Sequence, residues 1–129
     1  MRLRLRPITA LAHESLPTYR CGTGIPTVRR VRPGVVGWAK SVARELGPKK
    51  ITVNTIAPGK IDTGRVRELW RHHPDPAAAE RADIERVPAR RLGQPDEIGA
   101  AVAFLCSTRA AYISGTVLPV DGGLLRGLW

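Results

Sequence analysis

The stretch ITVNTIAPG, residues 51 to 59, constrains the fold more than any other part of the sequence. It is rich in β-branched residues, it does not alternate between apolar and polar side chains, and it ends in Pro58 and Gly59. A short apolar run of this kind is typical of a strand buried on both faces of a parallel sheet. Because parallel strands need long crossover connections, usually helical, we expect helices around it.

Helical patterns lie on both sides of this strand. GVVGWAKSVARELG, residues 34 to 47, carries an apolar stripe with Trp38 on its flank, and Gly47 and Pro48 supply a stop signal. QPDEIGAAVAFLCS, residues 94 to 107, opens with Pro95 and carries a second stripe. The expected stripes are Val35, Ala39, Val42 and Leu46 in the first helix, and Ile98, Ala101, Val102 and Leu105 in the second.

Residues 60 to 93 contain two shorter helical patterns. The first runs from Gly64 to Arg71, and the second begins at Asp75 or Pro76. The adjacent His72 and His73 at the break between them have diverging side chains and no third ligand in the sequence pattern, so we expect no metal site.

A second strand is expected from Thr116 to Val120, and Asp121 begins a turn after it. Two strands joined by mostly helical sequence imply a parallel crossover. The predicted fold class is therefore α/β, with helices on the faces of a parallel sheet.

Two blocks of the sequence resemble the C-terminal half of a short-chain dehydrogenase/reductase, with the 3-oxoacyl-carrier-protein reductases nearest in character. The blocks are GVVGWAKSVARELGPKKITVNTIAPGKIDT, residues 34 to 63, and RVPARRLGQPDEIGAAVAFLCSTRAAYISGTVLPVDGG, residues 86 to 123. The resemblance implies part of a Rossmann-type, doubly wound parallel sheet. The family's Gly-rich phosphate-binding motif has no counterpart here, so we expect the N-terminal nucleotide-binding half to be missing.

The expected domain organisation follows from the resemblance. Residues 1 to 33 form an irregular basic segment, residues 34 to 123 form the family-like region, and residues 124 to 129 form a tail. Within the family-like region, residues 64 to 92 correspond to the family's substrate lid. Asn54 corresponds to a residue that the family uses structurally within the strand.

The resemblance also implies a cofactor site where the first strand ends. In the family this strand ends beside the nicotinamide of NAD or NADP. Pro58 and Gly59 would line the cofactor, the backbone N–H of Ile61 would meet its carboxamide, and the hydroxyl of Thr63 would reach its pyrophosphate. Such a place is chemically reasonable, because ligands of open α/β sheets bind beyond the carboxyl ends of the strands.

The family's Tyr-x-x-x-Lys motif is not intact in this chain. Tyr19 ends ITALAHESLPTY, which resembles the segment before the catalytic tyrosine, so Tyr19 is the candidate catalytic residue. Counting forward from Tyr19, the lysine position holds Thr23. In the family the tyrosine transfers the proton of the substrate hydroxyl, and the lysine lowers the tyrosine pKa and holds the ribose.

Counting back from Gly34 leads to other residues. The tyrosine and lysine positions then hold Val28 and Arg32. The segment RCGTGIPTVRRVRP, residues 20 to 33, therefore replaces the turn of helix that should carry the lysine. One hypothesis is an out-of-frame stretch of GC-rich DNA, which favours Arg, Gly and Pro; resequencing the locus tests it.

The net charge of +10 is concentrated near the start of the chain, where residues 1 to 34 carry seven Arg and one Glu. Clustered cations can bind nucleic acid, but neither interleaved aromatic residues nor a known motif accompanies them, so we expect no nucleic-acid partner. No apolar run approaches the ~20 residues of a membrane span, so no membrane partner is expected. Cys21 and Cys106 form no metal or disulfide pattern, and no targeting signal is recognised, which favours a cytoplasmic location.

The expected function is that of an NAD(P)-dependent oxidoreductase polypeptide, truncated and catalytically impaired, whose family acts on small carbonyl or alcohol substrates. The alternative is a noncatalytic interaction subunit. Family members assemble through the helix corresponding to Val35 to Leu46 and through the final helix and strand, so a homo-oligomer is expected in either case.

Overall fold

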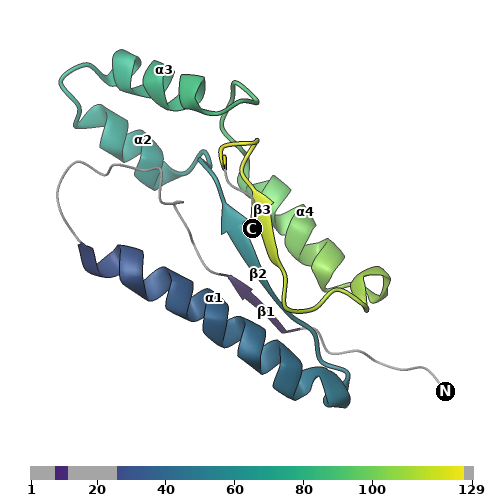
Figure 1. The fold of residues 1–129 in the computed structure, drawn as a ribbon. Coiled ribbons are helices and arrows are strands. Elements are labelled where there is room, and N and C mark those ends of the chain that lie inside the picture. The colour runs from purple at the N-terminus through teal and green to yellow at the C-terminus, as the bar shows by residue number, and fades with distance from the viewer. Residues whose placement is uncertain (1–7, 12–25, 127–129) are drawn as a thin grey trace.

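The computed structural model describes residues 8–11 and 26–126, with side-chain surroundings from residue 34 onward. Figure 1 shows how the strands and α-helices are arranged. The described part of the chain contains three strands, four α-helices and two short 3₁₀ turns. In chain order they are β1 (Ile8–Leu11), α1 (Pro26–Leu46), η1 (Gly47–Lys49), β2 (Val53–Pro58), α2 (Gly64–Arg71), α3 (Pro76–Arg86), α4 (Pro95–Leu105), η2 (Thr108–Ala110) and β3 (Val117–Val120).

The described strands form one parallel sheet in the order β1-β2-β3. Ile8 pairs with Val53 on one side of β2, and Thr55 pairs with Val117 on the other. All six residues of the central strand β2 are buried. The predicted parallel pairing and the predicted burial of this strand on both faces are therefore confirmed.

A helix covers each face of the sheet (Figure 1). Ala39 and Ala43 of α1 pack with Val53, and Leu105 of α4 packs with Ile56. Because successive side chains of a strand point to opposite faces, Val53 and Ile56 face different layers. The α/β fold is therefore a partial Rossmann-type sheet wound on both faces, as predicted.

Helix α1 differs from the prediction in its start and in its buried side. It begins at Pro26, and β1 also lies before residue 34, so the segment 1 to 33 is not irregular throughout. The helix continues through Pro33, which has no N–H to donate to the preceding turn. Val35 of the predicted stripe is 38% exposed, so it does not pack on the sheet as the stripe predicted, and Trp38 on the flank is 62% exposed.

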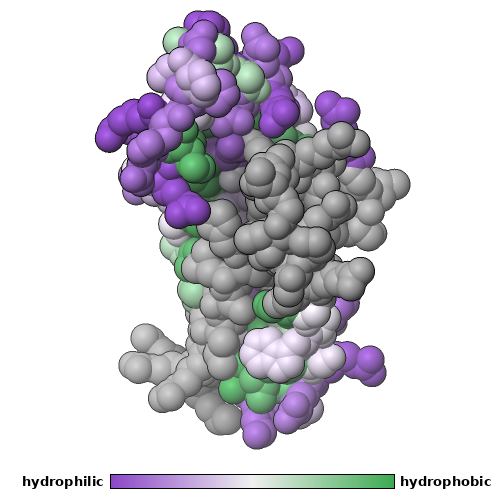
Figure 2. All heavy atoms as spheres, turned by 90° about the vertical axis from the view of Figure 1, so that its left-hand side faces the viewer, coloured by the Kyte–Doolittle hydropathy of each residue, from purple (hydrophilic) through white to green (hydrophobic). Residues whose placement is uncertain are grey.

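The two helices predicted for the lid are present, with the expected limits of α2 and the expected start of α3, and both lie beyond the carboxyl ends of the strands (Figure 1). Thr63 caps α2 and Asp75 caps α3 with their side chains. Neither helix contains a buried residue. Figure 2 shows hydrophilic residues gathered at the end of the molecule where these helices lie.

Candidate functional site

The site begins where β2 ends at Pro58. The N–H of Gly59 donates to the carbonyl of Val120 at 3.0 Å, which extends the contact between β2 and β3 by one residue. A Cβ atom on Gly59 would lie 2.5 Å from the Asp121 Cα, so only glycine fits this approach. Asp121 in turn accepts the N–H of Gly123 at 2.9 Å, which shapes the turn after β3.

A short parallel bridge closes the segment 64 to 92, named the lid after the family's substrate lid that it resembles. The N–H of Gly93 donates to the Lys60 carbonyl at 2.9 Å, and the N–H of Asp62 donates to the Gly93 carbonyl at 2.8 Å. In a parallel bridge of this pattern the residue between the two bonded groups directs its own N–H away from the partner segment. Ile61 therefore directs its N–H to the side opposite Gly93.

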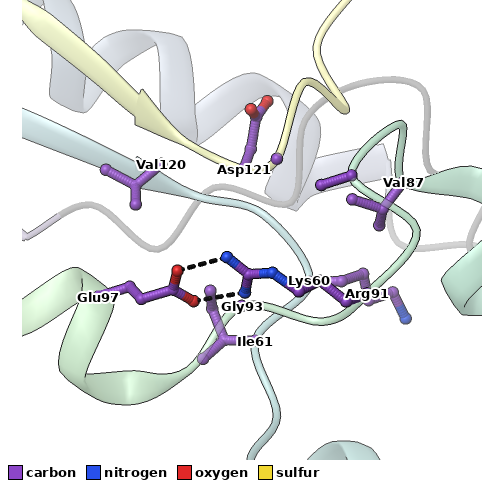
Figure 3. Close-up of a pocket in the computed structure, with 10 residues that line it drawn as sticks. Lys60, Ile61, Val87, Arg91, Gly93, Glu97, Val120 and Asp121 are labelled. Atoms are coloured by element: carbon purple, nitrogen blue, oxygen red, sulfur yellow. Dashed lines mark hydrogen bonds and ion pairs between the residues drawn. The ribbon is translucent and has the colours of Figure 1, made fainter.

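An ion pair stands on each side of this bridge. Asp62 accepts two hydrogen bonds from Arg67, both at 2.7 Å, and these bonds hold the pKa of the Asp62 carboxyl below its usual value. Glu97 accepts two from Arg91, at 2.8 and 2.6 Å (Figure 3). It also accepts one from the N–H of Gln94 at 2.7 Å. Arg91 first and then the Gln94 N–H lower the pKa of Glu97 from 4.5 to about 2.

Thr63 is the N-cap residue of α2. Its Oγ1 accepts the N–H of Val66 at 3.4 Å, and the side chain is exposed. A hydroxyl that accepts one hydrogen bond still has a proton to donate. Thr63 can therefore donate to an anion placed before the helix, where the positive end of the helix dipole favours negative charge.

Two hollows lie around this loop. The first, about 60 Å³, is enclosed by residues of the loop, of the lid end and of the turn after β3 (Figure 3). Small-molecule pockets usually measure about 300 to 1,000 Å³, so this cavity is too small for a dinucleotide. The second is an open groove of about 360 Å³. The groove is lined by Asp62, Arg67, Trp70, Glu80, Ile84 and Leu92.

The predicted cofactor residues lie together on one continuous loop. Pro58 is buried at the end of β2, Gly59 and Ile61 are partly buried, and Thr63 is exposed. Tyr19 lies outside the described residues, so its position relative to this loop stays a prediction.

Asn54 has the structural place that was expected of it. Its Nδ2 donates to the Ile113 carbonyl at 3.0 Å, and its Oδ1 accepts the N–H of Thr116 at 3.3 Å. The side chain is 1% exposed. It therefore ties β2 to the segment that leads into β3.

One polar cluster of the lid was not anticipated from the sequence. Asp83 accepts hydrogen bonds from both Lys60 and Trp70. The three residues are far apart in the sequence, and no motif connects them. The one available signal was a tryptophan on a short helix that is otherwise mostly polar and charged.

The parallel sheet, its two helical layers and the Pro-Gly turn before a helical lid define a partial dinucleotide-binding fold of the Rossmann type. The chain belongs to the short-chain dehydrogenase/reductase family. Residues 14–125 match the family model described as enoyl-(acyl carrier protein) reductase.

Relatives of known sequence agree with this membership. The chain is 43% identical over 96 residues to the 3-oxoacyl-[acyl-carrier-protein] reductase MabA of Mycobacterium tuberculosis, covering 74% of this chain and 36% of that protein. It is 47% identical over 93 residues to the reductase FabG of Vibrio harveyi, covering 72% and 36%. The chain thus spans little more than a third of the length of these curated relatives.

Solved structures show the same likeness. YwfH, an NADPH-dependent reductase involved in bacilysin biosynthesis, has a TM-score of 0.82 and 26% identity, covering 93% of this chain and 47% of YwfH. A protein of Agrobacterium tumefaciens proposed to be a 2-deoxy-d-gluconate 3-dehydrogenase, solved with NADP bound, has a TM-score of 0.76 and 36% identity, covering 92% of this chain and 46% of that protein.

Among the described helices, none has the length and apolar character needed to cross a bilayer.

Proposed function

We propose that the chain supplies the nicotinamide-side loop and the substrate lid of an NAD(P)-dependent oxidoreductase acting on a small carbonyl or alcohol substrate. The observation that carries this proposal is the loop from Pro58 to Thr63. It leaves the carboxyl end of the buried central strand and leads directly into the lid. Ligands of open α/β sheets bind at this edge.

The geometry of the loop supports the roles proposed for two residues. The bridge with Gly93 directs the Ile61 N–H away from the lid end, which leaves this donor for the carboxamide of a nicotinamide. The Thr63 hydroxyl precedes an α-helix, where orphan N–H groups favour a pyrophosphate. Pro58 and Gly59 would then form the wall beside the cofactor.

NADP is the first dinucleotide to test. YwfH is described as NADPH dependent, and the Agrobacterium tumefaciens protein was solved with NADP. When bound, such a cofactor would exchange a hydride with the substrate carbon. The residues of this chain would hold the nicotinamide and cover the substrate.

We also propose that proton transfer in this chain is impaired. The family positions counted from Gly34 hold Val28 and Arg32, and both lie within helix α1. A valine cannot transfer a proton. Tyr19 is the candidate that remains, and a tyrosine without a nearby cation ionises only near pH 10.

Titration calorimetry with NADPH and NADH, followed by turnover assays with ketone substrates, tests this function. We expect weak dinucleotide binding with little turnover, because the family's Gly-rich phosphate-binding motif has no counterpart in this chain. The double variant Val28→Tyr with Arg32→Lys should gain turnover over a matched Val28→Phe with Arg32→Lys control, because only the first restores the proton donor. Absence of dinucleotide binding would contradict the oxidoreductase proposal, and fast turnover by the unchanged chain would contradict the impairment.

A noncatalytic oligomerising subunit is the second candidate. Large apolar side chains are exposed on both helical layers, including Trp38 at 62% on α1 and Phe104 at 46% on α4. Exposed apolar patches often mark protein interfaces. Light scattering after size exclusion should give an oligomer that Trp38→Ser weakens, and a monomer at all concentrations would contradict this candidate.

A cytoplasmic location also stays a prediction, which fractionation of cells expressing the chain would test.

A further inference from the structure

The two lid helices must be held in place mainly by polar contacts. No residue of α2 or α3 is buried, and the two helices pack chiefly against each other. Elements with few buried apolar contacts open at low free-energy cost unless other interactions hold them. The position of the lid over the loop therefore depends on a small number of hydrogen bonds.

Asp83 of α3 makes two of these bonds with a single oxygen. Its Oδ2 accepts from the Nζ of Lys60 at 2.8 Å and from the Nε1 of Trp70 at 2.9 Å. Lys60 belongs to the loop after β2, and Trp70 belongs to α2. One carboxylate oxygen thus joins three separate segments of the chain.

This cluster is partly removed from water. The side chains of Lys60 and Asp83 are 17% and 15% exposed. An ion pair attracts more strongly in such surroundings than on an open surface. The cluster is therefore screened less by solvent than the exposed ion pairs of the lid.

The base of the lid is held independently of Asp83. The bridge between Ile61 and Gly93 closes the base, and the pairs Asp62 with Arg67 and Arg91 with Glu97 flank it. These contacts fix the two ends of the lid. Asp83 instead ties the bodies of both helices to the loop.

We propose that Asp83 is a positioning residue that latches α2 and α3 as one unit over the loop and holds the indole of Trp70 in the wall of the open groove. Removal of the Asp83 carboxylate leaves the base intact and frees the helices to move on it. The consequence for substrate and cofactor rests on the proposed function. The latch itself is a property of the chain without ligand.

Hydrogen exchange on the full chain without ligand tests the latch. Asp83→Ala should speed amide exchange in residues 64 to 86 by at least about tenfold, with exchange in β2 unchanged. Glu85→Ala, which removes an exposed acid from the same helix, should leave exchange unchanged. Unchanged exchange in residues 64 to 86 would overturn the proposal. An equal acceleration in β2 would also overturn it, because it would show that Asp83 stabilises the whole fold and not the lid in particular.

The two donors provide a second test, which also serves if Asp83→Ala does not fold. Trp70→Phe keeps an aromatic side chain but removes the indole N–H, and Lys60→Met removes the other donor. Each should give part of the acceleration in the lid, and adding Trp70→Phe to Asp83→Ala should add little. Full additivity, or no acceleration confined to the lid in either single variant, would overturn the proposal.

Fluorescence reports directly on the indole of Trp70. In a Trp38→Phe, Trp129→Phe background, Asp83→Ala should increase acrylamide quenching of Trp70, whereas Glu85→Ala should not. Equal quenching in both variants would overturn the latch. These measurements need no cofactor, so the two proposals can fail separately. Failure of dinucleotide binding in calorimetry would reject the proposed function, whereas hydrogen exchange and quenching decide on the latch.

Discussion

Gly59 stands so close to the turn after β3 that a Cβ atom on it would lie 2.5 Å from the Cα of Asp121. The same atom would lie 2.7 Å from the Asp121 Cβ and 2.9 Å from its carbonyl oxygen. Two of these three atoms belong to the backbone, so they cannot give way without moving the turn. The loop proposed to line the cofactor and the turn after β3 are therefore one packed unit.

Replacing Gly59 by alanine should destabilise the fold by about 1 to 3 kcal/mol or more, because the added methyl group overpacks this contact. Urea unfolding measures the change. Gly99→Ala is the matched control, since Gly99 lies in α4 with nothing within 4 Å of an added Cβ. That control should gain about 0.5 to 1 kcal/mol from helix propensity, and a similar effect of both changes would contradict the packing described.

Replacing Asn54 by alanine should lower the free energy of unfolding by about 2 to 4 kcal/mol. The change removes both the partner of the Ile113 carbonyl and the partner of the Thr116 N–H in a buried place. Ser114→Ala removes one hydrogen bond to the Val53 N–H from a more exposed residue and should cost about 1 kcal/mol. Equal losses in thermal unfolding of the two variants would argue against the role of Asn54.

Glu97 should make stability depend on pH in acid. Its pKa falls from 4.5 to about 2 in the folded chain, so its stabilising contribution is complete above pH 4.5 and disappears as the pH approaches 2. Glu97→Gln retains an oxygen for the Gln94 N–H but cannot form the ion pair. The difference in unfolding free energy between the unchanged chain and this variant should therefore shrink as the pH falls through this range.

Chemical denaturation at a series of pH values measures this difference. Asp96→Asn removes a neighbouring exposed acid and controls for the loss of charge. A difference between the unchanged chain and Glu97→Gln that stays constant down to pH 2 would show that Glu97 does not carry the effect.

Thr63→Ala should have two effects that Thr63→Ser largely avoids. Loss of the capping oxygen should cost about 1 kcal/mol of stability, and loss of the hydroxyl donor should weaken dinucleotide binding by about tenfold if the proposed role is right. Asp75→Ala removes the side-chain cap of α3 and is the matched control. It should cost similar stability without changing the dissociation constant measured by calorimetry. Equal weakening of binding by the two alanine variants would argue against a direct contact of Thr63 with the cofactor.

Local patterns predicted most of the secondary structure. The limits of α2, the start of α3 at Pro76 and the start of α4 at Pro95 agree with the structure, because caps and prolines act within one turn of helix. The predicted start of α1 at residue 34 was wrong, because the apolar period begins there whereas the helix begins at Pro26. The exposure of Val35 was also missed, because periodicity does not say how far along the helix the contact with the sheet extends.

From residue 34 onward, the sequence by itself determined the order of helices and strands, the burial of the central strand and the family-like loop from Pro58 to Thr63. Each of these follows from residue types within a few positions of one another. Only the tertiary structure decided that Gly59 contacts Asp121 and that Lys60 and Trp70 donate to the same oxygen of Asp83. Contacts of that kind depend on how the crossover brings distant segments to the same edge of the sheet. No local pattern of side chains encodes how closely two such segments approach each other.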